Sequence, residues 1–155
     1  MNFRVWNLRL GWFAFAVSLV SYLLTVEPTA SYWDCSEYIA TAAKLQVGHP
    51  PGAPFFQMVG AVFALFAPNV EYIALSVNMM SVLASSFTVL FLFWTITGIA
   101  RRLVREQAND NNTQILVLIA GLVGALGFAY TDSFWFNAVE AEVYAMATCI
   151  LSILF

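Results

Sequence analysis

Long apolar runs without a charged side chain constrain this chain more than any other feature. Three of them, residues 10–26, 73–100 and 114–131, could each cross a hydrocarbon core about 30 Å thick, which takes roughly 17–25 helical residues. A fourth run, 142–155, opens with Glu142 and is still apolar at the last residue, so we expect a truncated span and the N-terminal piece of a longer protein. With 61% hydrophobic and 10% charged residues, the composition is that of a membrane protein. We therefore predict an all-α fold, a polytopic transmembrane helix bundle with about four spans.

Arginines beside the first two spans indicate the orientation of the chain. Basic residues near span ends stay in the cytoplasm, so we expect the N-terminus there and residues 27–72 and 131–142 on the outer face. These arginines are Arg4, Arg9, Arg101, Arg102 and Arg105. A cleaved signal peptide would also begin with basic residues and an apolar stretch. However, this stretch is longer than a usual signal and Pro28-Thr29-Ala30 is a poor cleavage site, so a retained anchor is the better interpretation.

The outer loop 27–72 contains two segments that we expect to form juxtamembrane helices, at about 34–47 and 53–67. The second segment is apolar, but as a helix it would reach only about 22 Å. A span there would also move the later arginines to the outer face, against the positive-inside rule. We expect it to lie at the membrane surface or to re-enter the membrane, after a turn made by prolines and glycine.

Within this loop, a polar island with the sequence WDCSEYIATAAKLQVGHPPG begins at residue 33. Its pattern predicts a short helix that ends at Gly48 and cannot continue through the following prolines. Asp34 and Glu37 lie three residues apart and therefore share a helical face, whereas His49 is expected at the opposite end of the helix.

Three interpretations of the island remain open on residue chemistry. Asp34 and Glu37 suit a general base at an apolar boundary, and Lys44 or His49 suits a phosphate. Alternatively, Asp34 caps the helix, Glu37 completes a capping pattern and the rest is a solvated loop. A metal site is weaker: the carboxylates suit Mg²⁺ or Mn²⁺, but there is no second His and no cysteine pair of ligand spacing. We assign no metal ligand, and a divalent cation is the only cofactor considered.

The second outer segment, TDSFWFNAVEAEVY, is acidic and aromatic. Asn137, Glu140 and Tyr144 fall at helical spacing on one expected face, with Glu142 pointing roughly the other way. Such a polar face at the mouth of a span favours a bound polar ligand or a polar neighbour, whereas an interfacial aromatic belt with a solvated end is the alternative.

The motifs WDCSEYIATAAKLQVGHPPGAP and TDSFWFNAVEAEVYA resemble the N-terminal signatures of the family catalogued as domain of unknown function 2723, which is related to the protein O-mannosyltransferases. The resemblance extends over nearly the whole chain. It implies that residues 1–155 are the N-terminal part of a transmembrane domain of the GT-C superfamily of polytopic glycosyltransferases. It also implies an integral membrane protein, expected in the bacterial cytoplasmic membrane, with its site on the outer face.

The resemblance further implies a mechanism and its participants. A sugar, expected to be mannose, would pass from a polyprenyl-phosphate donor to a protein hydroxyl, with Asp34 or Glu37 as the base and Lys44 and His49 beside the departing phosphate. The protein O-mannosyltransferases carry adjacent Asp-Glu, whereas this chain has Asp-x-x-Glu, so the choice of base stays open and Asp34 is favoured. We expect substrate contacts from Asn137, Glu140, Glu142 and Tyr144 as well.

Other classes of function make different predictions. A transporter component would place ionisable residues near mid-membrane, and the three complete spans hold none. A non-catalytic membrane scaffold would not depend on the polar island. We expect membrane lipid, a sugar donor and a protein acceptor as partners and no nucleic acid, and we expect this piece to be inactive by itself.

Overall fold

The computed structural model describes residues 1–31, 33–50, 52–105 and 110–155, and all regular structure in them is helical. Pro51 of the expected turn lies outside the described residues. The α-helices are α1 (Phe3–Thr25), α2 (Asp34–Lys44), α3 (Pro54–Ala64), α4 (Ile73–Leu103), α5 (Asn111–Ala129), α6 (Asp132–Val139) and α7 (Val143–Leu154), and the short 3-10 helix η1 (Val70–Tyr72) precedes α4.

Three helices are long and apolar enough to cross a membrane: α1, η1 continued by α4, and α5. The pair α6 and α7 passes the same test only together and is bent by 108° at the break between them, so it gives a fourth span if the pair is counted as one. The predicted all-α class with about four apolar spans is therefore confirmed.

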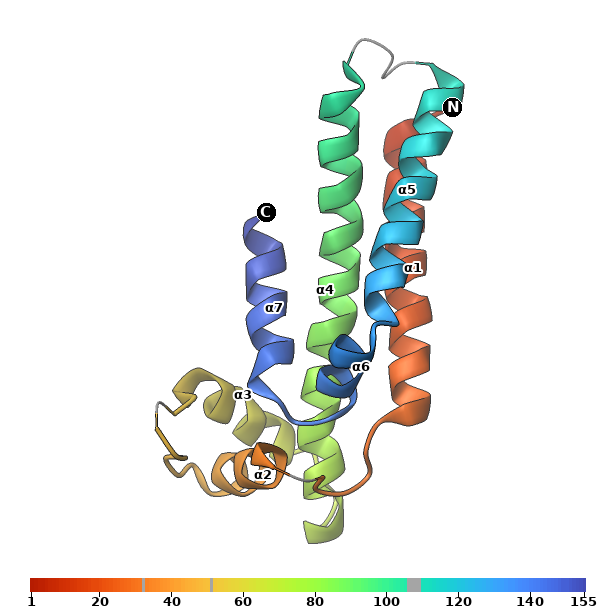
Figure 1. The fold of residues 1–155 in the computed structure, drawn as a ribbon. Helices are drawn as coiled ribbons and strands as arrows, with labels where there is room; N and C mark the ends of the chain where they lie inside the picture. The colour runs from red at the N-terminus through yellow and green to blue at the C-terminus, as the bar shows by residue number, and fades with distance from the viewer. Residues whose placement is uncertain (32, 51, 106–109) are drawn as a thin grey trace.

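Helix α4 is the centre of the bundle. It packs against α1 and α5 on one side and α7 on the other, and also contacts α2, α3 and α6 (Figure 1). Its 31 residues extend about 46 Å, which exceeds the roughly 30 Å of a hydrocarbon core. Helices α2 and α3 lie together beside the N-terminal end of α4, at the bottom of Figure 1, and the polar island therefore sits at one end of the bundle.

Buried apolar residues form two clusters, one in the bundle and one beneath the polar island. The first joins α1, α4, α5 and α6, with Tyr22, Val89 and Phe93 among its fully buried side chains. The second joins α2, α3 and the N-terminal part of α4 through Cys35, Phe56, Val77 and Met80, and it includes Ala141 from the α6–α7 connection. The second cluster therefore fixes α2 next to the α6–α7 connection, so that the polar face of α2 lies close to the residues around Ala141.

Helix α2 ends earlier than its sequence predicts. Leu45, at φ 49°, adopts the left-handed conformation that was expected at Gly48. The N–H groups of Leu45 and Gln46 donate to the carbonyls of Ala42 (3.2 Å) and Thr41 (2.8 Å), a Schellman arrangement that satisfies the last turn. The prediction of a helix end at Gly48 is wrong, because these bonds close the helix one turn sooner and release residues 45–48 to fold back along α2.

A buried asparagine on α4 ties the loop after α1 to the bundle. Asn78 is fully buried, and its Nδ2 donates to the backbone oxygens of Glu27 (2.7 Å) and Thr29 (3.1 Å). Its Oδ1 lies 3.9 Å from the Sγ of Cys35, which donates to it from α2. One side chain thus connects α4, α2 and the first outer loop.

Replacement of this residue should loosen the outer layer. In Asn78→Leu, the two backbone carbonyls lose their donor while staying buried, and each such loss costs about 1–3 kcal/mol. We expect the full-length variant to unfold at a lower temperature in detergent and residues 27–31 to become accessible to protease. Ser76→Ala, on the same helix, is the control and should change neither property; equal stability of Asn78→Leu and wild type would contradict this role.

Candidate functional site

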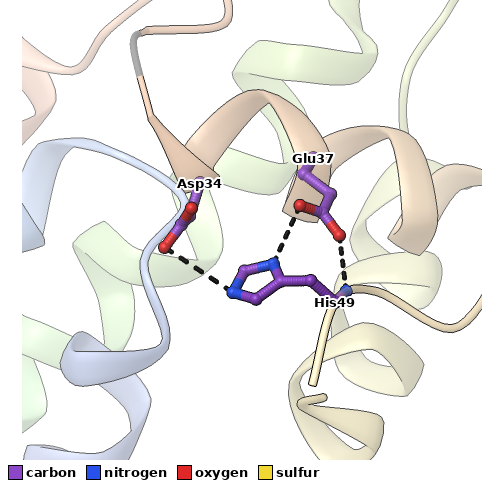
Figure 2. Close-up of side chains that lie close together, drawn as sticks. All are labelled: Asp34, Glu37 and His49. Atoms are coloured by element: carbon purple, nitrogen blue, oxygen red, sulfur yellow. Dashed lines mark hydrogen bonds and ion pairs between the residues drawn. The ribbon is translucent and has the colours of Figure 1, made fainter. Parts of the chain in front are cut away.

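Three ionisable side chains of the polar island converge at the N-terminal part of α2 (Figure 2). The backbone N–H of His49 donates to Glu37 Oε1 at 2.6 Å, and His49 Nδ1 lies 2.9 Å from Glu37 Oε2. His49 Nε2 lies 4.0 Å from Asp34 Oδ2. Because residues 45–48 fold back, His49 lies against the carboxylates rather than at the opposite end of the helix, where the sequence had placed it.

The two carboxylates have different surroundings. Both oxygens of Glu37 are engaged by His49, whereas the contact of Asp34 with the ring is longer, and no hydrogen bond holds the Asp34 carboxylate among the residues that the structure describes. The capping interpretation is wrong, because the N-cap residue is Trp33, no side chain caps the helix, and Asp34 is its first residue. Glu37 therefore fixes the returning chain, whereas Asp34 is half-exposed and has the longer contact with the ring.

The contact between Glu37 and His49 shifts both of their pKa values. The bond from the His49 backbone, followed by that from its ring, lowers the pKa of Glu37. The hydrogen bond to Glu37, followed by the charges of Glu37 and Asp34, raises the pKa of His49 despite a smaller opposing effect of burial. Both shifts favour the charged forms, an imidazolium on His49 beside the carboxylate of Glu37.

Gln57 of α3 supports the returning segment, and the sequence analysis did not single it out. Its side chain is buried. With its amide turned so that both ends are satisfied, it donates to the Gln46 carbonyl and accepts from Thr41 Oγ1 and Gly48 N, at 3.1–3.2 Å. A Cβ on Gly48 would lie 3.1 Å from both the side-chain amide of Gln57 and Glu37 Oε1, so a larger residue there would crowd the site. Gln57 is the single polar residue in the α3 sequence PFFQMVGAVFA, and this was the available signal.

The second outer segment does not form one continuous helix. Helix α6 ends at Val139, Glu140 and Glu142 are extended, and α7 begins at Val143. Remote contacts accompany the break: Glu27 N donates to the Val139 carbonyl (3.0 Å). The predicted single helical face of Asn137, Glu140 and Tyr144 is therefore wrong.

The break nevertheless brings these residues to one cavity of about 560 Å³. Its volume lies in the range of small-molecule sites. Glu142 also lines it, contrary to the expectation that this residue points away. The lining residues are Ser31, Trp33, Asp34, Phe136, Asn137, Glu140, Glu142 and Tyr144.

The cavity is acidic. Glu140 Oε2 accepts a hydrogen bond from Ser31 Oγ at 2.7 Å, which joins the two outer segments directly. Burial, followed by the charges of Asp34 and Glu140, raises the pKa of Glu142. Burial, followed by Asp34 and Glu142, also raises the pKa of the neighbouring Tyr38. Carboxylates from two distant parts of the chain therefore share one electrostatic environment.

Exposed aromatic rings flank these carboxylates. Trp33 is 91% exposed and has φ 63°, a region rarely occupied by residues other than glycine and often found at functional sites. Phe136 and Tyr144 are also largely exposed. The sequence analysis missed Ser31, Trp33 and Phe136; the aromatic residue directly before Asp34 was the visible signal for Trp33.

Lys44 is not brought into this site. It is exposed in the last turn of α2, ten residues after Asp34, or about 15 Å along a helix. Among the residues that the structure describes, no basic side chain lines the cavity, and His49 is the nearest positive group to Asp34. The arrangement therefore suits neutral hydroxyl-bearing groups better than phosphate.

The three converging side chains also offer ligands for a cation. Asp34, Glu37 and His49 each present one ligand atom, and these atoms lie within 4.8 Å of one another. Mg²⁺ or Mn²⁺ would need further oxygens from water or substrate to complete its coordination. A cation would compete with His49 for the Glu37 carboxylate, because both Glu37 oxygens already accept from His49.

Comparisons with known proteins agree on one family. The family model for the protein O-mannosyl-transferase TMEM260 N-terminal domain matches residues 34–155. The chain is also similar to protein O-mannosyl-transferase tmem260 of Dictyostelium discoideum, at 26% identity over 136 residues. That match covers 87% of this chain and 15% of the relative, so the chain spans a small part of the relative's length. No solved structure matches the chain.

The pKa shifts predict a pH-dependent contribution to stability. The raised pKa of His49 makes its contribution complete below its usual value of 6.5 and lost as the pH rises through the raised value. The lowered pKa of Glu37 makes its contribution complete above its usual 4.5 and lost as the pH falls through the lowered value. His49→Gln should therefore lower the melting temperature of the full-length protein more at about pH 6 than at about pH 9.

Thermal unfolding in detergent at both pH values measures this difference. Lys44→Gln on the same helix is the control, since Lys44 is exposed and takes no part in the contact between Glu37 and His49. An equal effect of His49→Gln at the two pH values would show that the ion pair contributes nothing.

Proposed function

Since this chain belongs to the family of the protein O-mannosyl-transferase TMEM260 N-terminal domain, we propose that it forms part of a membrane glycosyltransferase that moves mannose to a protein hydroxyl. The curated relative is named as a protein O-mannosyl-transferase. The proposal extends that activity to this chain, with the remaining machinery supplied by parts of the protein outside these residues.

The cavity lining supports a sugar as the ligand. A pyranose has apolar faces that stack on exposed rings, such as Trp33 and Phe136, and hydroxyls that donate to carboxylates, such as Glu140 and Glu142. Asn137 Nδ2 already donates to the Ser133 carbonyl at 2.7 Å, which leaves its oxygen as an acceptor. The lining holds three carboxylates and, among the described residues, no basic side chain, so we place the sugar of the donor in the cavity and its phosphate outside it.

The observation that carries the assignment of the base is the unequal engagement of the two carboxylates. Asp34 lines the cavity and is half-exposed, whereas Glu37 is held by His49 and does not line it. Asp34 is therefore proposed as the general base and Glu37 as a positioning residue. The acceptor oxygen attacks the anomeric carbon, its proton passes to Asp34, and the bond from that carbon to the phosphate oxygen breaks with its electron pair leaving on the phosphate.

The finer features rest on the resemblance to GT-C enzymes of the domain of unknown function 2723 family. We propose a polyprenyl-phosphate donor, whose tail stays in lipid while its sugar reaches the outer or lumenal face. Of the two basic groups expected beside the departing phosphate, His49 is the nearer to the cavity, since its ring lies 4.0 Å from Asp34 whereas Lys44 lies about 15 Å along α2. A bacterial cytoplasmic membrane remains the proposed location, although the curated relative comes from a eukaryote.

The proposed topology has α1, α4 and α5 crossing the membrane, α7 entering it as the truncated fourth span, and α2, α3 and α6 at its outer surface. The arginines at the other end of α4 support a cytoplasmic N-terminus. Under this arrangement, loop 27–72 and segment 131–142 form one site on a single face of the membrane.

Substitution of Asp34 in the full-length protein tests the mechanism. Asp34→Asn should lower kcat by about 10²–10⁴-fold, the usual contribution of a general base, with normal membrane expression. Glu37→Gln should cost less, because an amide oxygen still accepts the backbone N–H of His49. Trp33→Ala should raise KM for the donor more than it lowers kcat, since stacking holds bound sugar before and during reaction.

Transfer of radiolabelled mannose from polyprenyl-phosphate mannose to a serine-containing peptide measures these effects. Glu71→Gln removes an exposed carboxylate of the same loop outside the cavity and should be silent. Wild-type rates in Asp34→Asn would exclude it as the base, and unchanged transfer in Asp34→Asn and Trp33→Ala together would favour a non-catalytic scaffold.

Cysteine labelling tests the topology separately. Val47 is 90% exposed in the first outer loop, Asp132 begins α6, and Arg105 lies beyond the opposite end of α4. Val47→Cys and Asp132→Cys in intact cells should both react with an impermeant maleimide, while Arg105→Cys should react only after permeabilisation. Protection of either outer position would contradict a site built from both segments.

A further inference from the structure

A buried amide on α3 holds the chain that returns to the candidate site. Gly60 of α3 has no room for a side chain, because a Cβ there would lie 2.9 Å from the Cβ of Ala42. This close approach of α3 to α2 lets Gln57, which is 6% exposed, reach the returning segment. In the orientation that satisfies both ends of its amide, Gln57 donates to the Gln46 carbonyl at 3.1 Å and accepts from the Gly48 N–H at 3.2 Å.

These two bonds give direction to a contact that is otherwise apolar. Phe56 and Gly60, the other buried residues of α3, contribute packing, and apolar packing favours close approach without fixing a direction. Hydrogen bonds form only within narrow limits of distance and angle. Buried polar groups set register in some proteins although their burial costs free energy. Gln57 therefore fixes the position of residues 46–48 relative to α3.

The position of residues 46–48 determines where His49 lies. His49 follows this segment directly, and its backbone N–H and its ring engage the two oxygens of Glu37. Its Nε2 also lies 4.0 Å from Asp34 Oδ2, so a shift of the segment would move the ring beside the proposed base. Gly48 is enclosed on both sides, since an added Cβ would lie 3.1 Å from the Glu37 carboxylate and from the amide on α3.

We propose that Gln57 is a positioning residue for the transfer reaction, which holds His49 beside Asp34 through the returning segment and does not touch the substrate. This inference deepens the proposed function and rests on it. Gln57 does not line the cavity, and the exposed rings that would hold the sugar lie on other segments. Its loss should therefore lower kcat and leave KM for the donor nearly unchanged.

Gln57→Met in the full-length protein removes both hydrogen bonds and keeps a side chain of similar length. We expect kcat for mannosyl transfer to fall about 10–100-fold, because misplacement of a reacting group by about 1 Å has an effect of that order. Gly48→Ala tests the same path without removing a hydrogen-bonding group, since its Cβ would push the segment away from α3, and it should lower kcat in the same way. Met58→Leu is the matched control, because Met58 is on α3 and 63% exposed, and it should change neither constant.

A double-mutant cycle separates positioning from a general loss of stability. If Gln57 acts through His49, Gln57→Met should lower kcat no further in a His49→Gln background. A residue that only stabilises the fold would instead add its own loss to that of His49→Gln. Additive losses, or wild-type kcat in Gln57→Met, therefore overturn the inference.

Amide hydrogen exchange tests the geometry without the reaction. The Gly48 N–H bonds to Gln57 and the His49 N–H to Glu37, so Gln57→Met should speed exchange at both amides while those in the middle of α4 stay unchanged. We expect roughly fivefold, the effect of one net hydrogen bond on an equilibrium. Unchanged exchange at His49 overturns the inference even if transfer is intact. Faster exchange at both amides in a protein that transfers no mannose would overturn the proposed function and leave the link between Gln57 and His49 standing.

Discussion

The hydrogen bonds of the Asn78 side chain are the interaction on which the arrangement of the first outer loop and α2 depends. Its amide meets the carbonyls of the first outer loop, and its oxygen meets Cys35 at the start of α2. The same loop reaches α6 through the bond from Glu27 N to the Val139 carbonyl. Buried polar groups must be paired, so this small network determines where both outer segments can lie. The cavity exists because two chain segments about a hundred residues apart in sequence are attached to one asparagine and its neighbours.

The spans could be predicted because an apolar run has few alternatives when it is this long. The break at Glu140 could not, since neither glycine nor proline marks it and the helical spacing of Asn137 and Tyr144 continues through it. The contacts at the break come from Glu27 and Ser31 and from the burial of Ala141 beneath α2. Local periodicity contains no information about such remote partners. Asn137, Glu140 and Tyr144 do lie near one another, but they do not share one helical face.

A similar limit applies to the polar island. The spacing of Asp34 and Glu37 correctly indicated a shared helical face, but the return of His49 depends on Leu45 adopting a conformation that usually favours glycine. Once His49 returns, it distinguishes two carboxylates that are chemically alike in the sequence. Gln57, buried in an otherwise apolar helix, supports this position of His49, because its side chain bonds to the backbone of the segment that carries His49.

The length of α4 limits how far from the membrane a substrate can reach the cavity. About 46 Å of helix less about 30 Å of hydrocarbon leaves about 16 Å of α4 outside the membrane core. Under the proposed topology, Val77, Asn78 and Met80, which hold the layer of α2 and α3, fall within that projecting part. The height of the layer above the lipid would then be set by one rigid element. Under the proposed function, a sugar carried directly on a lipid phosphate matches this height, whereas the outer end of a long lipid-linked oligosaccharide would extend past the cavity.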